Sequence, residues 1–273
     1  MVFDARDPFH ADLLDALYVS TAAAGYQISL AARTSSRSRN ATVEALLQAR
    51  CEGIISLGET VDRKVLDAYP GNPAVVLVGH GGRLDWADTV HTADDKGVDH
   101  AVVHLAGLGH REIAHIDGGS RPGAADRRRG YRRAMRRLGL TGQQHVVRGD
   151  YTEASGTAAV HQWIRDGTLP TAVIAGNDRC ATGVLDACLR SGVAVPQQLS
   201  VVGYDDSQLS RLAHINLTTV AQDTAQLAAA AVDATVERLD RDRTTARTIT
   251  LAPHLVLRGT TAAPPPRSRS AGP

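Results

Sequence analysis

The sequence contains few of the residues on which most familiar chemical sites depend. Among its 273 residues are three cysteines, Cys51, Cys180 and Cys188, and none of them belongs to a CxxC pair. Because three cysteines cannot all pair with one another, we expect a reducing compartment, in which these thiols are small buried hydrophobic side chains. Lysine occurs only at Lys64 and Lys96, and no GxxxxGK(S/T) phosphate loop is present. The sequence therefore argues against a disulfide-stapled scaffold and a P-loop nucleotide site.

Long apolar runs and a strong net charge are also missing. No run approaches the roughly 18 apolar residues of a membrane span, and the N-terminal MVFDARDPFH lacks the apolar segment of a signal peptide. The 30 basic and 29 acidic residues leave a formal charge of +1. The sequence therefore predicts a cytoplasmic protein without a membrane partner, in which any nucleic-acid binding is local.

Motifs that would supply catalysis are incomplete. The stretch GLGHRE has two of the glycines of a dinucleotide fingerprint and follows a helix pattern instead of a strand. His100 and His104 are spaced i, i+4, but the zincin glutamate and a third ligand are missing. There is no GxSxG elbow, and no cysteine lies in an activating motif. We therefore expect no enzyme activity, no metal and no cofactor.

What the sequence does contain is a regular alternation of strand and helix patterns. With 43% apolar residues, the chain can build the cores of two ordinary domains. Strand patterns lie at 27–31, 53–57, 74–78, 112–116, 144–147, 172–175, 199–203 and in NLTTVA at 216–221. Helix patterns lie at 9–24, 40–50, 61–69, 95–108, 124–138, 153–166 and 179–191, and an Ala-rich helix follows 223. Several strands are continuously apolar, so this order predicts an α/β fold with doubly wound parallel sheets.

The number of strand and helix units is too high for one compact sheet. The irregular stretch at 79–95 is the best candidate for a crossing between two similar lobes. The stretch 261–273 is rich in Pro, Ser and Arg, so it is predicted to be a disordered tail. Ligands of such sheets bind beyond the carboxyl ends of the strands, so two facing lobes would form a ligand cleft.

Asn177 and Asp178 follow one predicted strand and open the next helix. Both residue types are good helix N-caps, and only one residue can be the cap. If Asp178 is the cap, Asn177 is free to present its amide to a ligand. The sequence leaves these two alternatives open.

The helix pattern at 124–138 carries seven arginines. Such a run is usually a solvated helix face, and nucleic-acid binding is the less favoured alternative. Tyr131, Ala134, Met135 and Leu138 form the predicted buried stripe, and Arg127 is the one arginine that continues it. A buried arginine needs a partner, and a ligand with paired oxygens would be one.

Asp205 and Asp206 end another strand pattern, and Gln222 follows NLTTVA. Consecutive residues of a strand point to opposite sides, so the two carboxylates are not expected to converge as a catalytic pair. We expect Asp205 to face the ligand and Asp206 to secure the turn behind it. On its own, Gln222 is a weak candidate.

Taken together, several stretches resemble one known family. They are DPFHADLLDALYVSTAAAGYQI, CEGIISLG, HLAGLGHREIAHIDG, DRRRGYRRAMRRLGL and the segment from PTAVIAGND to TTVAQD. These stretches resemble the effector-binding domain of lactose/galactose-repressor-type (LacI/GalR) transcription regulators, over about residues 3–259 and most specifically over 170–223. The resemblance implies two periplasmic-binding-protein-like lobes of type I crossed three times by the chain, an effector cleft between them, and a homodimer. The lobes that it implies are 1–88 plus 223–250 and 89–222 plus 251–260.

Position by position, the resemblance places the effector contacts on Arg127, Asn177, Asp205 and Gln222. It also implies that the loop after the first strand contributes Asp7, Phe9 and His10, with Phe9 offering an apolar face to a sugar or base ring. Many sugar-binding members have an acidic residue after the strand equivalent to AVVLV. This chain has GHGG there, so His80 is expected to line that side of the cleft in place of the acidic residue.

The resemblance implies the effector-binding and dimerisation region of a regulator, with a sugar or related polar metabolite as effector. Family members normally begin with a helix-turn-helix and a hinge helix, and no matching stretch occurs here, so operator DNA is expected to be read only through such a domain. The first strand is expected to be under way already where the chain begins. The alternative is a free-standing solute-binding protein, which would need a signal for export.

Overall fold

The computed structural model describes residues 1–58, 60–69, 73–241 and 243–266. The chain forms two compact units, of which unit 1 comprises Met1–Ala93 and Gln222–Pro253. Unit 2 comprises Asp94–Ala221 and the chain from His254 onward. The chain thus passes between the units three times. The predicted borders followed residues 88, 222 and 250, whereas the units change after Ala93, Ala221 and Pro253, so Gln222 opens the second segment of unit 1.

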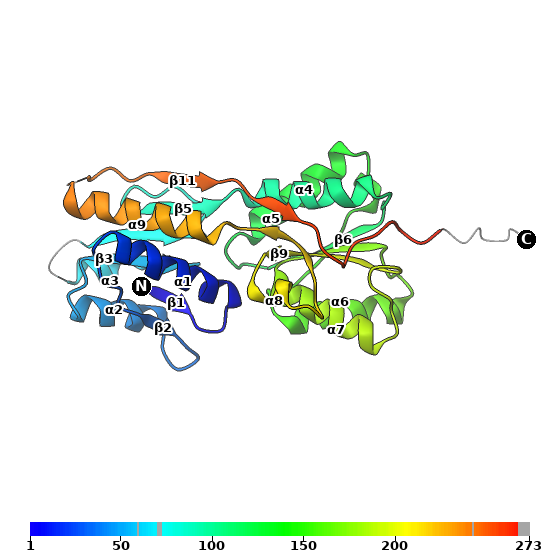
Figure 1. Cartoon of the computed structure of the whole chain (residues 1–273), viewed down its shortest axis with the longest axis horizontal. Coiled ribbons are helices and arrows are strands. Elements are labelled where there is room, and N and C mark those ends of the chain that lie inside the picture. The colour runs from blue at the N-terminus through cyan, green and yellow to red at the C-terminus, as the bar shows by residue number, and fades with distance from the viewer. Residues whose placement is uncertain (59, 70–72, 242, 267–273) are drawn as a thin grey trace, which may run out of the picture. The chain divides into compact units, whose positions relative to one another are not determined.

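Unit 1 is built on a six-stranded sheet in which every pair of neighbours is parallel. Its order is β11 (Thr248–Leu251), β5 (Asp88–Thr92), β4 (Ala74–Val78), β3 (Gly53–Leu57), β1 (Val2–Asp4) and β2 (Ala31–Arg33). The helices described in this unit are α1 (Pro8–Ala23), α2 (Arg39–Gln48), α3 (Arg63–Asp67) and α9 (Thr224–Asp240). Helices α1 and α9 pack together over one face, and α2 lies against β1 and β2 (Figure 1).

Unit 2 repeats this plan with one antiparallel edge strand. Its sheet order is β12 (His254–Val256), β10 (Thr218–Ala221), β9 (Ser200–Asp205), β8 (Ala172–Ala175), β6 (Ile113–Ile116) and β7 (His145–Val147), and β12 is antiparallel to β10. Helices α4 (Asp94–Gly107) and α5 (Ala124–Arg137) cover one face. Helices α6 (Glu153–Asp166) and α7 (Asp178–Arg190) cover the other, and the short α8 (Gln208–Arg211) follows β9 (Figure 1). The predicted α/β class with doubly wound parallel sheets is confirmed.

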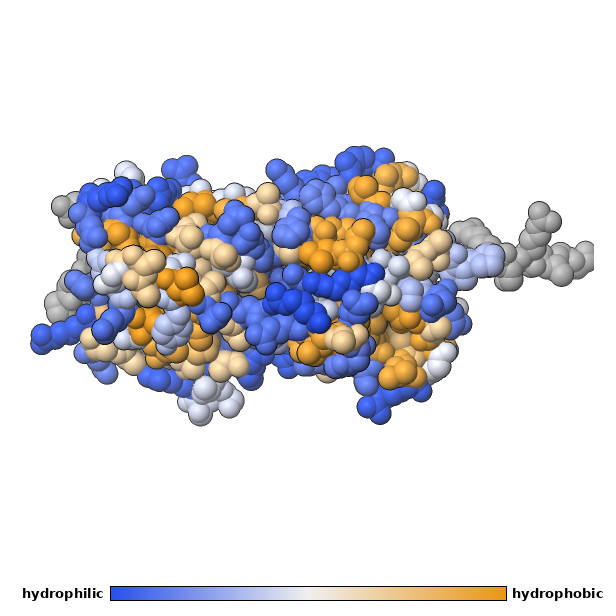
Figure 2. All heavy atoms as spheres, in the orientation of Figure 1, coloured by the Kyte–Doolittle hydropathy of each residue, from blue (hydrophilic) through white to orange (hydrophobic). Residues whose placement is uncertain are grey.

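On the face drawn in Figure 2, hydrophobic residues form small patches that hydrophilic residues separate. Within the part of the chain that the structure describes, no helix combines the length and apolar character needed to span a membrane.

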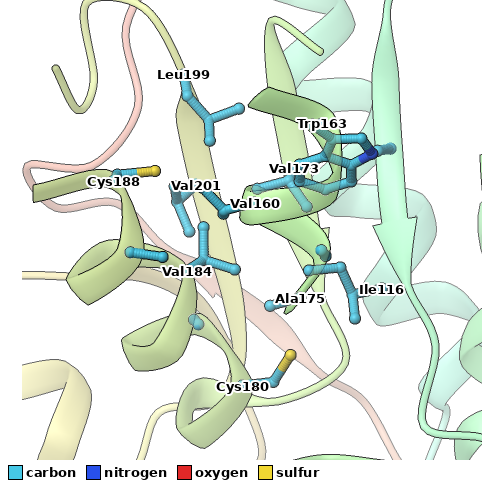
Figure 3. Close-up of a cluster of buried hydrophobic side chains, with 14 of the residues drawn as sticks. Ile116, Val160, Trp163, Val173, Ala175, Cys180, Val184, Cys188, Leu199 and Val201 are labelled. Atoms are coloured by element: carbon cyan, nitrogen blue, oxygen red, sulfur yellow. The ribbon is translucent and has the colours of Figure 1, made fainter. Parts of the chain in front are cut away.

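One hydrophobic core of unit 2 lies between its sheet and helices α6 and α7. Its largest buried side chain is Trp163. Trp163 of α6 lies beside Val173 of β8, Val201 of β9 belongs to the same cluster, and α7 contributes Cys180 and Cys188 (Figure 3). Burial raises the pKa of both thiols to about 11. They therefore remain protonated and unreactive at neutral pH, as expected for small hydrophobic side chains. Cys51 is half-buried and is also a free thiol.

The sequence patterns predicted neither β11 nor β12, and two further segments differ from their predictions. The pattern at 27–31 predicted a strand, but backbone pairing with β1 begins only at Ala31, and Ile28 packs against the core of unit 1 instead. The segment 79–95, predicted as an irregular crossing, contains β5. Its pattern was obscured by Asp88, a fully buried carboxylate that accepts hydrogen bonds from Arg238 and Arg243.

The disordered tail was predicted to begin at residue 261, but residues 261 and 262 form hydrogen bonds with unit 2. The Ala262 N–H donates to Ser200 Oγ at 3.0 Å, and the Ala262 carbonyl accepts a hydrogen bond of 2.8 Å from His110 Nε2. Thr261 Oγ1 lies 3.2 Å from His104 Nε2. These contacts hold residues 261 and 262 on unit 2, and composition cannot reveal such tertiary partners. Residues 267–273 lie outside the described residues.

Candidate functional site

The carboxyl ends of the unit 2 strands gather charged and aromatic side chains around Arg127. This residue lies in the first turns of α5, with only 6% of its surface exposed. Tyr131, Ala134 and Met135 of the same stripe are fully buried, as the helical periodicity predicts. Leu138 is 40% exposed because it lies at the C-cap, where the helix ends.

The partners of Arg127 come from three separate elements. Its Nε donates to Asp94 Oδ1 of α4 at 3.0 Å, and Nη1 donates to the Gly176 carbonyl at 2.6 Å. Its Nη2 lies 3.6 Å from Asp205 Oδ1, at the end of β9. The guanidinium carbon is 3.6 Å from the ring centroid of Tyr204. The expectation that a buried Arg127 needs partners is thus confirmed, and these are protein groups.

Tyr151 joins this cluster from the loop after β7. The Arg127 guanidinium carbon lies 5.3 Å from its ring centroid, within the range of a cation–π interaction. The ring lies so close to Gly118 that a Cβ there would come within 2.1 Å of it, and the Tyr151 hydroxyl donates to the Pro122 carbonyl. Burial raises the pKa of Tyr151 above its ordinary range, so the phenol stays neutral.

Sequence reasoning missed both Asp94 and Tyr151. Asp94 lies at the end of the stretch that the pattern assigned to an irregular crossing. Tyr151 follows the strand pattern at 144–147 by a few residues, and this position after a strand is the signal that marked the other candidates.

Asn177 is the N-cap of α7, because its Oδ1 accepts a hydrogen bond of 2.8 Å from the Cys180 N–H. The alternative in which Asp178 is the cap is therefore wrong, and the amide nitrogen of Asn177 is the group that the cap does not use. Asp178 is almost fully buried. It accepts hydrogen bonds from the Ser207 N–H, from Ser207 Oγ and from Thr219 Oγ1.

Asp205 and Asp206 point to different partners, as expected, although neither residue keeps the extended backbone of a strand. Asp206 Oδ1 accepts hydrogen bonds from Ser210 Oγ at 2.9 Å and from Arg258 Nη2 at 2.6 Å, so it secures the turn. Asp205 lies beside Arg127. The φ values of Asp205 and Asp206 are +116° and +52°, a region that L-residues with side chains adopt at a cost. The surrounding contacts must hold this backbone in place.

The remaining arginines of α5 are largely neutralised by aspartates. Arg128 pairs with Asp117, and Arg129 pairs with Asp126. Arg133 and Arg137 bind Asp95 and Asp99 of α4. This ladder of ion pairs fits a solvated helix face, and it removes most of the positive charge that a nucleic-acid contact would need.

The other predicted contact residues lie in unit 1. Asp7 caps α1 by accepting from the Phe9 N–H at 3.1 Å. The ring of Phe9 is partly buried against the core of unit 1. His10 is buried, and its Nδ1 lies 3.2 Å from the Asp4 N–H at the end of β1.

His80 and Gln222 also lie just after strands. His80 follows β4, and burial together with the neighbouring His91 lowers its pKa. Gln222 follows β10 and is half-buried. Over the described ranges, no group of three or more His, Cys, Asp or Glu side chains is arranged to bind a metal ion.

Known proteins resemble both the sequence and the fold. The periplasmic binding protein-like domain family matches residues 102–261. The ribose operon repressor of Escherichia coli K12 is 30% identical over 271 residues, covering 95% of this chain and 80% of the repressor. A LacI transcriptional regulator from a Rhodococcus species has a TM-score of 0.91 and 44% identity, over 96% of this chain and 97% of that one.

The dimeric Lac repressor with an 11-residue C-terminal deletion has the same fold. Its TM-score is 0.84 at 26% identity, over 96% of this chain and 98% of that one. These three proteins are regulators of transcription and not enzymes.

Proposed function

Because this chain belongs to the lactose/galactose-repressor (LacI/GalR) family of transcriptional regulators, we propose that it is the effector-binding and dimerisation region of such a regulator. Its effector is a small polar molecule of the sugar class. The observation that carries this proposal is the buried pairing of Arg127 with Asp205 at the carboxyl ends of the unit 2 strands. A donor and an acceptor held side by side match a sugar, whose hydroxyls both donate and accept.

Each proposed contact has a defined role. Asp205 accepts hydrogen bonds from hydroxyls, while Arg127 and the amide nitrogen of Asn177 donate to sugar oxygens. The ring of Tyr151 supplies an apolar face beside these polar groups.

A second set of contacts comes from unit 1. We assign to it Asp7, Phe9, His10 and His80, which follow strands of the unit 1 sheet, and Gln222, which follows β10 of the unit 2 sheet. In this set Phe9 provides an apolar face, and the others provide hydrogen bonds.

The mechanism that follows is linkage between two binding events. An effector that binds one conformation of the dimer more tightly than the other shifts the population toward the first. By thermodynamic reciprocity, the same coupling changes the affinity for operator DNA, typically by about 5- to 150-fold. The operator is bound through a helix-turn-helix domain and not by these two units, and the regulator acts in the cytoplasm. The ribose operon repressor is a repressor, which favours this function over a free-standing solute-binding protein.

A thermal-shift screen with sugars, polyols, sugar phosphates and purines tests the proposal. A ligand at 100 times its Kd stabilises the folded state by about 2.7 kcal/mol, which raises the Tm measurably. We expect a sugar to raise the Tm of the wild type. The shift should disappear in Arg127→Ala and in Asp205→Ala.

The matched control is Arg129→Ala, which removes an exposed arginine of the same helix that pairs only within α5. It should retain the full shift. An undiminished shift in both Arg127→Ala and Asp205→Ala would show that the effector binds elsewhere.

A further inference from the structure

The turn that carries Asp205 has an unfavourable backbone conformation. The φ values of Asp205 and Asp206 are +116° and +52°, and residues with side chains seldom adopt these regions. Such a conformation persists only where neighbouring groups hold it, and it is common where a side chain is presented to a ligand. The orientation of the Asp205 carboxylate therefore depends on contacts that other elements make with this turn.

One of these contacts comes from Asp178, the first residue of α7. Its Oδ2 accepts hydrogen bonds from the Ser207 N–H at 2.7 Å and from Ser207 Oγ at 2.9 Å. Its Oδ1 accepts a hydrogen bond of 2.5 Å from Thr219 Oγ1 of β10, so the carboxylate joins the turn to a strand of the sheet. Because Asp178 is only 1% exposed, water has little access to replace these hydrogen bonds.

The same helix terminus also presents Asn177. This residue is the N-cap of α7, so its position is fixed relative to Asp178, the next residue. Gly203 of β9 permits the close approach of the two elements, because a Cβ there would lie 2.3 Å from Asp178 Oδ1. One helix terminus thus sets two side chains that we assign to the effector. It sets Asn177 directly, and it sets Asp205 through the turn that Asp178 holds.

From these contacts we propose that Asp178 is a positioning residue, which holds the Asp205 carboxylate in the orientation that binds the effector. Asp178 does not itself touch the effector. A contact group that is held in place before binding loses less conformational freedom when the ligand arrives, so the affinity is higher. The inference rests on the proposed function, since it concerns the affinity of the site for its effector.

Hydrogen–deuterium exchange tests the contact without a ligand. In Asp178→Ala, peptides that contain residues 204–210 should exchange about tenfold faster than in the wild type, because the Ser207 N–H loses its acceptor and the turn can open. In Asp178→Asn the side-chain oxygen can still accept from Ser207, so this variant should restore most of the protection. Equal exchange in Asp178→Ala and the wild type would overturn the inference and leave the proposed function intact.

A double-mutant cycle tests the consequence for binding. Isothermal titration with ribose, glucose and galactose is carried out at pH 8, because burial raises the pKa of Asp178. For a sugar that binds the wild type, Asp178→Ala should weaken binding about tenfold, and in an Asp205→Asn background it should have almost no further effect, since it acts through Asp205. An equal loss in both backgrounds, or no loss in the first, would remove the positioning role. If none of the three sugars binds the wild type, the proposed function fails for these sugars, while the exchange experiment still decides whether Asp178 holds the turn.

Thr219→Val decides the same question if Asp178→Ala folds poorly. Valine has nearly the shape of threonine, and the change removes the hydroxyl that anchors the carboxylate to β10. We expect it to weaken sugar binding about threefold, because Asp178 is then held less firmly. Val160→Ala is the matched control, since it removes buried methyl groups of α6 in the same unit and should leave the affinity unchanged. An equal loss of affinity in these two variants would show that lost stability alone weakens binding, and Asp178 would have no positioning role.

Discussion

His115 of β6 is a buried histidine with an unusual environment. Its Nδ1 lies 3.0 Å from the Ile174 carbonyl, and its ring stacks on Tyr131 with centroids 5.4 Å apart. Among the described residues, its Nε2 has no hydrogen-bond partner. Because the ring is completely buried, a proton on Nε2 would place an unpaired charge in the core. Burial accordingly lowers the pKa of His115 to about 4.

This histidine predicts a loss of stability in mild acid. The unfolded chain binds the proton with an ordinary pKa near 6.5, whereas the folded chain does so only near 4. Neutral His115 makes its full contribution to the free energy of unfolding above pH 6.5. This contribution is lost as the pH falls toward 4, by about 3 kcal/mol in total. His115→Phe, which retains a ring against Tyr131, should lose less stability over this range in urea denaturation. His161→Phe, an exposed control on α6, should follow the wild type, and an identical acid loss in His115→Phe would contradict the prediction.

At the scale of elements, Asp178 ties the start of α7 to β10 and to the turn after β9. It receives hydrogen bonds from Ser207 on one side and from Thr219 on the other. Gly203 allows this approach, because a Cβ there would lie 2.3 Å from Asp178 Oδ1. The carboxylate therefore supports the turn in which Asp205 adopts its positive φ. Burial raises the pKa of Asp178 above its ordinary value.

Asp178→Ala should destabilise the protein by about 3 kcal/mol, because it leaves a backbone N–H and two hydroxyls without their acceptor. The free energy of unfolding from chemical denaturation measures this loss. Asp186→Ala is the control from the same helix. Its carboxylate is half exposed and pairs with Arg190 at i, i+4, so its removal should cost less than about 1 kcal/mol. Equal losses of unfolding free energy in the two variants would show that the buried hydrogen bonds of Asp178 stabilise the protein no more than the exposed ion pair of Asp186 does.

In this region, local sequence patterns predicted some structural features and missed others. Apolar periodicity predicted α5 and the buried position of Arg127, because apolar residues spaced three and four apart mark the buried face of an amphipathic helix. It did not distinguish Asn177 from Asp178 as the cap, since both residue types suit that position. The choice depends on Ser207 and Thr219, which are distant in sequence. For the same reason β5 was missed: the pairing of Asp88 with Arg238 and Arg243 is invisible from residues 79–95.

At the scale of the whole molecule, the alternation of strands and helices predicted two α/β units. It did not by itself predict that each unit is assembled from separate stretches of chain. The resemblance to a family supplied that feature, because the three passages between units are set by tertiary packing and leave little local signal. The predicted contact residues follow the same rule: helical periodicity marked Arg127 and strand ends marked Asn177 and Asp205, but only the fold brought Asp94 and Tyr151 to them.

The proposed homodimer needs a contact surface, and unit 2 has a candidate around Leu189. Leu189 of α7 is 80% exposed, beside a groove of about 850 Å³ that is lined by Leu185, Val193, Val195 and Ile215 among others. An exposed leucine next to a groove that contains several apolar side chains suits a self-complementary contact with a second copy of the chain. The dimeric Lac repressor, which shares this fold, supports the choice of occupant.

Leu189→Asp should therefore convert the dimer to a monomer, because it would bury a charge at the centre of the contact. Sedimentation velocity across a range of protein concentrations measures the mass, and far-ultraviolet circular dichroism verifies the fold. Leu257→Asp is the matched control, a leucine of unit 2 that is 60% exposed and does not line the groove. It should remain dimeric. If Leu189→Asp is dimeric as well, the contact must lie elsewhere, and the exposed Tyr18 and Val19 of α1 become the next surface to change.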